Sequence, residues 1–419
     1  MGLAVAYELS KKSDIEVDVF EAGDRLGGMS VSFDFDGLNI ERYYHFICKP
    51  DTPLFETLEE LGIKDKLKWT ETRMGYYFKG ELHEWGNPFA LLKFPHIDLV
   101  TKIRYGLMAF ISAKRSDWSG LDKIDAVSWI TKWIGQKGYD TLWRSLFELK
   151  FYEYTPNLSA AWIWTRIKRV GNSRKSLFQE ELGYLEGGSE TLLNALADSA
   201  RAKGVNITLS QPIREVILKD GCVQGIRFGD HTRDYDAVIS TAPLPLVPQF
   251  VPDLPESLKA KFDTVDNIAV VCIIVKLKKA VSPYFWLNIV DDRMDIPGIV
   301  EYSNLNPLPE HIVYIPYYVP GENPLYLEPD ETFEEKARRY LKYINPDLSD
   351  DDFLRIEVSR YRRAQPICPP GFLDLIPPVK LPVQGLYVAD TSYYYPEDRG
   401  ISESIRIGRE IADMVAEQK

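Results

Sequence analysis

The sequence predicts an α/β protein in which one domain is assembled from three separated chain segments and a second domain is interleaved with it. Three observations support this. Residues 1–48 and 184–250 each read as strand-and-helix pieces, and a last strand and helix occupy 376–419. The stretches 49–183 and 251–375 differ, the first mainly helical and aromatic, the second rich in long strands. A continuous domain would show its strand–helix–strand units in one block, so the interruptions predict two domains.

The first segment begins with a helix and then a strand. Residues 1–12 carry apolar side chains at helical spacing, and the apolar run VDVF (17–20) ends at Glu21. Gly2 precedes this acid by nineteen positions. An acid about 20 residues after the G-x-G-x-x-G turn binds a ribose hydroxyl in dinucleotide-binding βαβ units, so Gly2 is predicted to be its third glycine. We therefore expect the first strand and the two phosphate-binding glycines upstream of Met1.

The next stretch is mainly helical. An apolar helical pattern spans 52–63, and the alternating run MGYYFKGELHEW turns at Lys79-Gly80, which predicts a hairpin. Residues 87–170 then read as helices rich in tryptophan. Such helices usually form a domain core, and the alternative is a large apolar pocket.

The second α/β piece starts at the turn Gly187-Gly188. Ser189 is the predicted N-cap of a helix over 190–203, and the strand VNITL follows. Two alternating runs around Asp220-Gly221 predict another hairpin.

Two long strands, NIAVVCIIVKL and HIVYIPYYV, predict a second sheet beyond the buried strand in YDAVISTAP. The chain closes with the strand GLYVAD, a loop and an amphipathic helix.

Composition excludes several classes of function. The net charge is −12 and no basic run interrupts it, so a nucleic-acid partner is not expected. The four cysteines and five histidines are scattered without ligand spacing, so no metal site is predicted, and free thiols fit a cytoplasmic protein. No apolar run approaches the roughly 18 residues of a membrane span.

Several motifs occur together and in a fixed order: VFEAGDRLGGMS, GYLEGGSETLLNAL, QPIREVI, DAVISTAP, and GLYVADTS followed by DRGISESIRIGREIA. In this order they resemble the flavin amine oxidase superfamily over nearly the whole chain. The most similar members are the protoporphyrinogen oxidase-like and phytoene desaturase-like enzymes, with UDP-galactopyranose mutases more distant. The resemblance implies a discontinuous Rossmann-like FAD-binding domain of the glutathione reductase type, an interleaved substrate domain, and FAD as cofactor.

The resemblance also implies roles for particular residues. Glu21, with Ala22 beside it, would bind the adenosine ribose, and Ile213 would read the adenine through its backbone. Asp390 would lie near the ribitol. The amides at Gly400, Ile401 and Ser402 would stabilise negative charge on the flavin. The remaining cofactor residues implied are Gly2 at the phosphate turn, Arg25, Gly27, Gly28, Met29 and Ser30 along the pyrophosphate and ribitol, and Tyr44 at the flavin ring.

His45 is the candidate catalytic residue, because it falls where the family's chain passes the flavin ring; a structural histidine is the alternative. Lys150 resembles a lysine common at this helix end, and a lysine that extends to solvent explains it equally well. Asp398-Arg399 precedes the last helix, and a surface ion pair is its alternative.

The function that the resemblance implies is oxidation or desaturation of an apolar small molecule by hydride transfer to FAD. One alternative is a non-redox mutase of a nucleotide sugar, with Arg360, Arg362 and Arg363 binding the diphosphate. The other is a binding scaffold without flavin.

Residues 88–115 combine many apolar side chains with five basic ones and one acid, Asp98. Such a segment can lie on an anionic bilayer, or it can close the substrate domain against the rest of the protein.

Overall fold

The computed structural model describes residues 1–176 and 178–417. Its helices are α1 (Gly2–Leu9), α2 (Thr52–Glu60), α3 (Pro88–Lys93), α4 (Leu99–Lys114), α5 (Ala126–Leu142), α6 (Arg144–Phe151), α7 (Ala160–Asn172), α8 (Ser189–Ala202), α9 (Val247–Phe250), α10 (Glu256–Phe262), α11 (Asp330–Ile344), α12 (Phe372–Leu375) and α13 (Ile401–Ala416). Its strands are β1 (Asp18–Phe20), β2 (Ser32–Phe35), β3 (Leu38–Glu41), β4 (Leu67–Thr72), β5 (Met74–Phe78), β6 (Glu81–Trp85), β7 (Arg174–Ser176), β8 (Gln179–Leu185), β9 (Asn206–Thr208), β10 (Glu215–Lys219), β11 (Cys222–Phe228), β12 (His231–Asp234), β13 (Val238–Ser240), β14 (Asn267–Leu277), β15 (Trp286–Val290), β16 (Gly298–Glu301), β17 (His311–Pro320), β18 (Phe353–Pro366) and β19 (Leu386–Val388).

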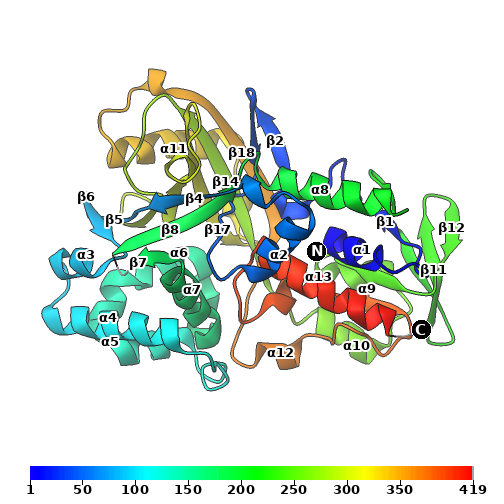
Figure 1. The fold of residues 1–419 in the computed structure, drawn as a ribbon. Coiled ribbons are helices and arrows are strands. Elements are labelled where there is room, and N and C mark those ends of the chain that lie inside the picture. The colour runs from blue at the N-terminus through cyan, green and yellow to red at the C-terminus, as the bar shows by residue number, and fades with distance from the viewer. Residues whose placement is uncertain (177, 418–419) are drawn as a thin grey trace.

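Three segments far apart in sequence pack together. The blue α1, green α8 and red α13 lie side by side, and Leu3, Leu196 and Ile405 share one buried cluster (Figure 1). Beside them, β1 pairs in parallel with β9, and β13 pairs in parallel with β19. The α/β fold expected from the sequence is therefore present. Helix α2 also packs here through Leu54 and Leu58. The domain limits at 48/49, 183/184, 250/251 and 375/376 stay predictions, and the last two residues of the third segment lie outside the described residues.

The largest sheet among the described residues runs in the order β18-β14-β17-β16-β15-β5-β6. Its strand β14 is buried on both faces, which explains its unbroken apolar sequence. Val271 and Ile273 pack toward α11, whereas Val270 and Cys272 face the opposite side. The predicted hairpin β5–β6 joins this sheet, since β15 pairs in parallel with β5.

The aromatic stretch forms the helices α3 to α7, at the lower left of Figure 1. Trp129, Trp162 and Trp164 are buried in the main core cluster. The Trp164 indole donates a hydrogen bond of 3.0 Å to the Ser112 carbonyl oxygen. These tryptophans therefore form a core, as the first of the two interpretations predicted.

One local prediction is wrong. Ser189 is the first residue of α8 and not its N-cap, a position that Gly188 occupies without a side-chain hydrogen bond. The amide of Ser189 donates instead to the carboxylate of Glu41, at 2.7 Å. A long-range partner thus replaces the local cap that the sequence predicted.

Candidate active site

A cavity of about 560 Å³ lies where the three-segment unit meets the large sheet, a volume typical of ligand sites. Most of the predicted site residues line it: Gly2, Glu21, Gly27, Gly28, Met29, Ser30, Tyr44, His45, Asp390, Gly400, Ile401 and Ser402. Residues that lie far apart in the sequence therefore line the same cavity.

Three predicted cofactor residues, Ala22, Arg25 and Ile213, lie outside this lining. The Arg25 guanidinium donates to the Ser32 carbonyl oxygen, which holds it against the chain. Ile213 follows a segment tied to the Glu21 turn, because the Gln211 amide donates to the Glu21 carbonyl oxygen at 2.9 Å. The structure thus brings the segment before Ile213 to the Glu21 turn, and the ribose and adenine contacts stay predictions.

Glu21 stands at the end of β1, where the short parallel pairing with β9 fixes the backbone. Its Oε1 atom accepts a hydrogen bond of 2.7 Å from the Gly23 amide. This bond orients the carboxylate, and Glu21 lines the cavity. A carboxylate held in this way can accept hydrogen bonds from a ribose.

The glycine turn after β1 has a backbone that requires glycine. Gly27 has a φ of +124° and Gly28 a φ of +56°. A Cβ atom on Gly27 would lie 2.5 Å from Leu193 Cδ1, so α8 packs directly on this turn. Gly2 is also closely packed, since a Cβ there would lie 3.2 Å from Thr241 Oγ1. Gly27 is therefore a position that favours glycine, and Gly2 is closely packed, while its role in the motif stays a prediction.

Helix α13 begins at the cavity, with Gly400 as its N-cap. The unpaired amides of a helix N-terminus attract negative charge. Asp390 lies near the same end and accepts hydrogen bonds from the Leu244 amide at 2.7 Å and the Ser392 amide at 2.8 Å. Burial raises the pKa of Asp390, and these two hydrogen bonds oppose the rise. Asp390 thus connects the loops that follow β13 and β19.

Aromatic side chains from the large sheet form the opposite wall. The Tyr44 ring meets Trp286 edge-on at 5.7 Å between centroids, and its hydroxyl lies 3.1 Å from the Tyr318 hydroxyl. Phe46 packs on Phe285 in the same way, at 5.7 Å. Such a wall suits an apolar ligand and excludes water.

Two titratable side chains in the cavity are held away from their charged forms. Burial lowers the pKa of His45, although Glu41, whose Oε2 atom is 4.0 Å from His45 Nδ1, acts in the opposite direction. Burial also holds the pKa of Lys150 well below its ordinary value, with Arg166 contributing in the same direction. The Lys150 nitrogen lies 4.5 Å from the centroid of the Tyr318 ring. Lys150 therefore belongs to the site and does not extend to solvent.

Charged pairs that the sequence did not predict border the same cavity. Arg166 Nη2 lies 3.1 Å from Asp398 Oδ1, and Arg169 Nη2 lies 2.9 Å from Asp51 Oδ2. Burial would raise the pKa of Asp398, but the surrounding cations, with Arg166 first, hold it below its ordinary value. The surface ion-pair interpretation of Asp398-Arg399 is therefore wrong. These residues come from α7 and from the segments before α2 and α13, so only the tertiary fold brings them together.

The cavity also contains polar atoms that lack protein partners. His45 Nδ1, Arg166 Nε, Glu180 Oε2 and Arg399 Nε are all buried without a hydrogen-bond partner among the described residues, and all four residues line the cavity. Buried polar atoms are nearly always satisfied in folded proteins, so unpaired ones indicate a polar ligand. Together with the glycine turn and the α13 N-terminus, they fit a bound dinucleotide.

The three arginines considered for a nucleotide-sugar diphosphate lie on β18, and they are not gathered on the cavity. Arg360 donates to the carbonyl oxygens of Tyr326 and Glu328, and Arg362 donates to the Gly321 carbonyl oxygen. Arg363 alone of the three lines the cavity.

Comparison with known proteins shows which family this chain belongs to. The sequence profile of flavin-containing amine oxidoreductases matches residues 2–414. A 15-cis-phytoene desaturase of Synechococcus elongatus is 24% identical over 281 residues, which cover 60% of this chain and 58% of the desaturase. The match thus spans less than two thirds of that relative.

Solved structures share the fold over their full length. A protein of Exiguobacterium sp. 255-15, named as a candidate protoporphyrinogen oxidase, superposes with a TM-score of 0.78 at 16% identity, covering 100% of this chain and 96% of that one. An oxidoreductase of Methanosarcina mazei gives 0.73 at 18% identity, covering 100% and 97%. A putrescine oxidase gives 0.75 at 15%, covering 100% and 96%. The family match over nearly the whole chain confirms FAD as the cofactor, and the protein belongs to the flavin-containing amine oxidoreductase family.

Proposed function

We propose that the protein is an FAD-dependent oxidoreductase that oxidises or desaturates an apolar substrate. One observation carries the proposal: the cavity runs without interruption from the dinucleotide-binding elements to the aromatic wall of the large sheet. When bound, the flavin accepts a hydride from a C–H bond of the substrate. One relative, the 15-cis-phytoene desaturase, adds support, since phytoene is an apolar molecule.

The chain's own residues would orient the substrate and handle protons. The rings of Tyr44, Trp286 and Tyr318 would pack on an apolar molecule and keep water out. Lys150 is the candidate proton acceptor, because an amine with a strongly lowered pKa accepts a proton nearer neutral pH than a free lysine does. His45 stays a predicted catalytic residue, and its lowered pKa would keep it uncharged at neutral pH.

The two alternatives are less well supported. A mutase of a nucleotide sugar needs cations for a diphosphate, and two of the three β18 arginines are occupied by protein carbonyl oxygens. A scaffold without flavin would not need buried polar atoms that lack partners around a cavity of this kind.

The test is anaerobic reduction of the FAD-loaded protein by candidate substrates. The measured signal is the loss of the oxidised-flavin absorbance. We expect reduction by phytoene or a porphyrinogen, and slower reduction by the polar diamine putrescine. Lys150→Met should slow reduction by at least tenfold, the usual size of an acid–base contribution being about 10²–10⁴-fold. If the variant binds substrate with an unchanged binding constant, the slower reduction reflects the loss of proton transfer and not the loss of substrate packing. Fastest reduction by putrescine would contradict an apolar substrate. Interconversion of a nucleotide sugar without net flavin reduction would favour the mutase.

A second prediction concerns Glu21 and cofactor affinity. Glu21→Ala should weaken FAD binding by about 1–3 kcal/mol, because it removes a charged hydrogen-bond acceptor for the ribose. Fluorescence titration of the apoprotein with FAD measures this. Asp24→Ala, at an exposed neighbouring acid, is the matched control and should leave affinity unchanged. Equal affinities for both variants would remove Glu21 from the cofactor site.

We also propose an anionic lipid bilayer as a partner, contacted through α3 and α4. Apolar residues of these helices face solvent, each 48–64% exposed: Phe89, Leu92, Leu99, Val100, Ile103, Leu107 and Phe110. Phe178 from the neighbouring loop stacks on Phe89 at 5.0 Å and extends the patch. So many exposed apolar groups in one region usually mark an interaction surface. The interpretation that this segment closes the substrate domain therefore accounts for only its buried members, such as Met108.

The segment is basic, so its charge favours an anionic membrane as the partner. A protein with a net positive charge would be the less favoured partner, and one that is net negative like this chain would be repelled by the rest of the molecule. Lys93, Lys102, Arg104, Lys114 and Arg115 lie in or next to α3 and α4, within a protein of net charge −12. Each basic residue at an anionic surface contributes about 1 kcal/mol. No helix among the described residues has the length and hydropathy to cross a bilayer, so the proposed contact is peripheral.

Sedimentation with liposomes tests the proposal. Wild-type protein should co-sediment with vesicles containing anionic lipid at low salt, and less with neutral vesicles. Ile103→Ser combined with Phe110→Ser should reduce the bound fraction several-fold, because both side chains are exposed and their loss does not touch the core. Leu327→Ser, which changes a 74% exposed residue elsewhere, is the control. Equal recovery of wild type in the supernatant with both lipids would contradict the membrane contact.

A further inference from the structure

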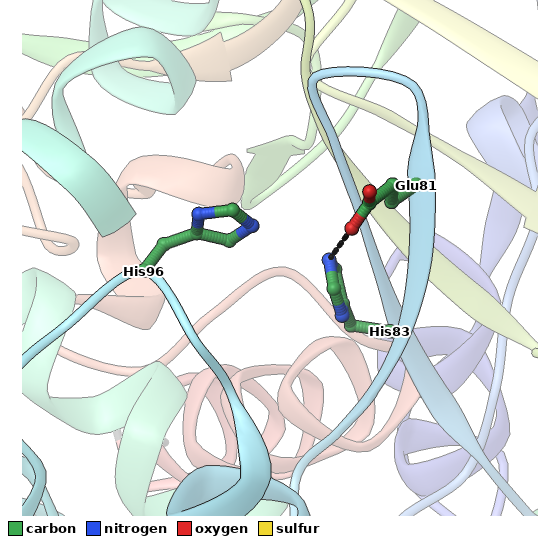
Figure 2. Close-up of side chains that lie close together, drawn as sticks. All are labelled: Glu81, His83 and His96. Atoms are coloured by element: carbon green, nitrogen blue, oxygen red, sulfur yellow. Dashed lines mark ion pairs between the residues drawn. The ribbon is translucent and has the colours of Figure 1, made fainter.

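Three side chains outside the active site converge although the sequence predicted no metal site. Glu81 and His83 lie two residues apart on β6 and so share one face of the strand. His96 comes from the loop between α3 and α4. One potential ligand atom from each lies within 4.8 Å of the others, and the side chains face one another in Figure 2. None of the three lines the active-site cavity.

The two imidazoles each have a nitrogen without a hydrogen-bond partner among the described residues. The Nε2 atoms of His83 and His96 are buried and have no hydrogen-bond partner among the described residues. A buried imidazole nitrogen that lacks a partner is uncommon, and a metal ion is one ligand that satisfies it. An imidazole binds a metal through a ring nitrogen that carries no proton, which each of these Nε2 atoms can provide.

Aromatic contacts hold the rings in place. His96 stacks on Phe78 at 4.2 Å, and Phe94 meets both histidine rings edge-on at 5.2 Å. Two fixed imidazoles lose little freedom on binding an ion, which favours affinity. Glu81 completes the group from an exposed position, so its side chain can adjust to the ion.

The distances suit a small transition-metal ion. His83 Nε2 lies 3.6 Å from Glu81 Oε2. In a tetrahedral zinc site with bonds of about 2.1 Å, neighbouring ligand atoms lie about 3.4 Å apart. That pair is thus near its bound separation. All three ligand atoms already lie within 4.8 Å of one another, so small shifts, chiefly of the exposed Glu81 carboxylate, would complete the site. Two imidazoles and one carboxylate form a ligand set that zinc and similar divalent ions accept, with the fourth position open to water.

We propose that Glu81, His83 and His96 bind a divalent transition-metal ion of the zinc type. The ion would connect the hairpin β5–β6 to the loop that leads into α4, two elements that otherwise meet through the packing of aromatic rings. This role is structural and independent of the proposed flavin chemistry.

The experiment uses the full-length, FAD-loaded protein after treatment with a chelator. Calorimetric titration with Zn²⁺ alone should give one equivalent bound per chain. Co²⁺ in its place should give the visible absorption of a four-coordinate site with nitrogen and oxygen ligands. Zn²⁺ should also raise the melting temperature of the wild type.

Variants locate the site. His83→Gln and His96→Gln should each weaken Zn²⁺ binding by about 100-fold or more and abolish the shift in melting temperature, whereas Glu81→Gln should weaken it about tenfold. His231→Gln, on the exposed strand β12, is the matched control and should bind as the wild type does. An unchanged flavin spectrum shows that each variant is folded. The proposal is overturned if the wild type binds less than one equivalent, or if binding is the same in His83→Gln and His96→Gln as in the control.

Discussion

Asp51→Ala is expected to lower the free energy of unfolding by about 3–5 kcal/mol, because it leaves a buried cation without its counter-ion. Asp51 is 8% exposed and binds the Arg169 guanidinium at two atoms, at 2.9 and 3.3 Å. The same carboxylate accepts a hydrogen bond of 2.8 Å from the Cys48 amide. The substitution therefore removes partners for a charge and for a backbone donor at once.

Denaturant titration at pH 7 measures this loss. The exposed pair formed by Glu71 and Lys175, 2.8 Å apart, is the matched control. Glu71→Ala should cost less than about 1 kcal/mol, as exposed ion pairs usually do. Adding Arg169→Met to Asp51→Ala should recover part of the stability, since the unpaired cation is then gone. Equal losses for Asp51→Ala and Glu71→Ala would show that water reaches Arg169 from the cavity.

The elements that the sequence predicted are those whose signals are local. The strand that ends at Glu21 and the two hairpins follow from alternation and from turn residues. Lys79 and Asp220 indeed have positive φ angles at those hairpin turns. The start of α13 follows from a glycine ahead of an amphipathic run. Each signal lies within about ten residues, a range in which backbone preference decides the structure.

The elements that the sequence missed depend on distant partners. Strand β18 carries several charged residues, and the sequence pattern predicted no strand there. In the structure those charges are paired: Arg355 contacts Asp36, and Arg360 contacts Asp330 at the start of α11. The strand forms because it pairs with β14 along its length, a long-range condition that residue type does not reveal.

The candidate site divides in the same way. The candidate cofactor residues that line the cavity could be picked out from the sequence, since they follow short motifs with fixed spacing. The aromatic wall and the charged pairs come from segments hundreds of residues apart, such as Tyr44 and Tyr318. Likewise, His83 and His96 are thirteen positions apart and match no ligand spacing, so only the packing of the β5–β6 hairpin on the next loop brings them together.

Gly27→Ala should destabilise the protein by about 2–4 kcal/mol, the sum of backbone strain and overpacking. Its φ of +124° is a conformation that residues with a Cβ rarely adopt. The new methyl group would also lie 2.5 Å from Leu193 Cδ1 on α8, so the Leu193 side chain or the turn must shift. Since the same turn lines the cofactor cavity, FAD affinity should fall together with stability.

Gly37→Ala separates the two contributions. Gly37 has a φ of +84°, and a Cβ there would meet nothing within 4 Å, so its loss should reflect backbone strain alone, about 1 kcal/mol. Denaturant titration of both variants, with and without FAD, gives the difference. Leu193→Ala should cost less in the Gly27→Ala protein than in the wild type, because the smaller side chain relieves the contact. If Gly27→Ala is instead as stable as Gly37→Ala and binds FAD normally, the turn has room to shift. The close packing of α8 on the phosphate-side turn would then not be what shapes the cofactor site.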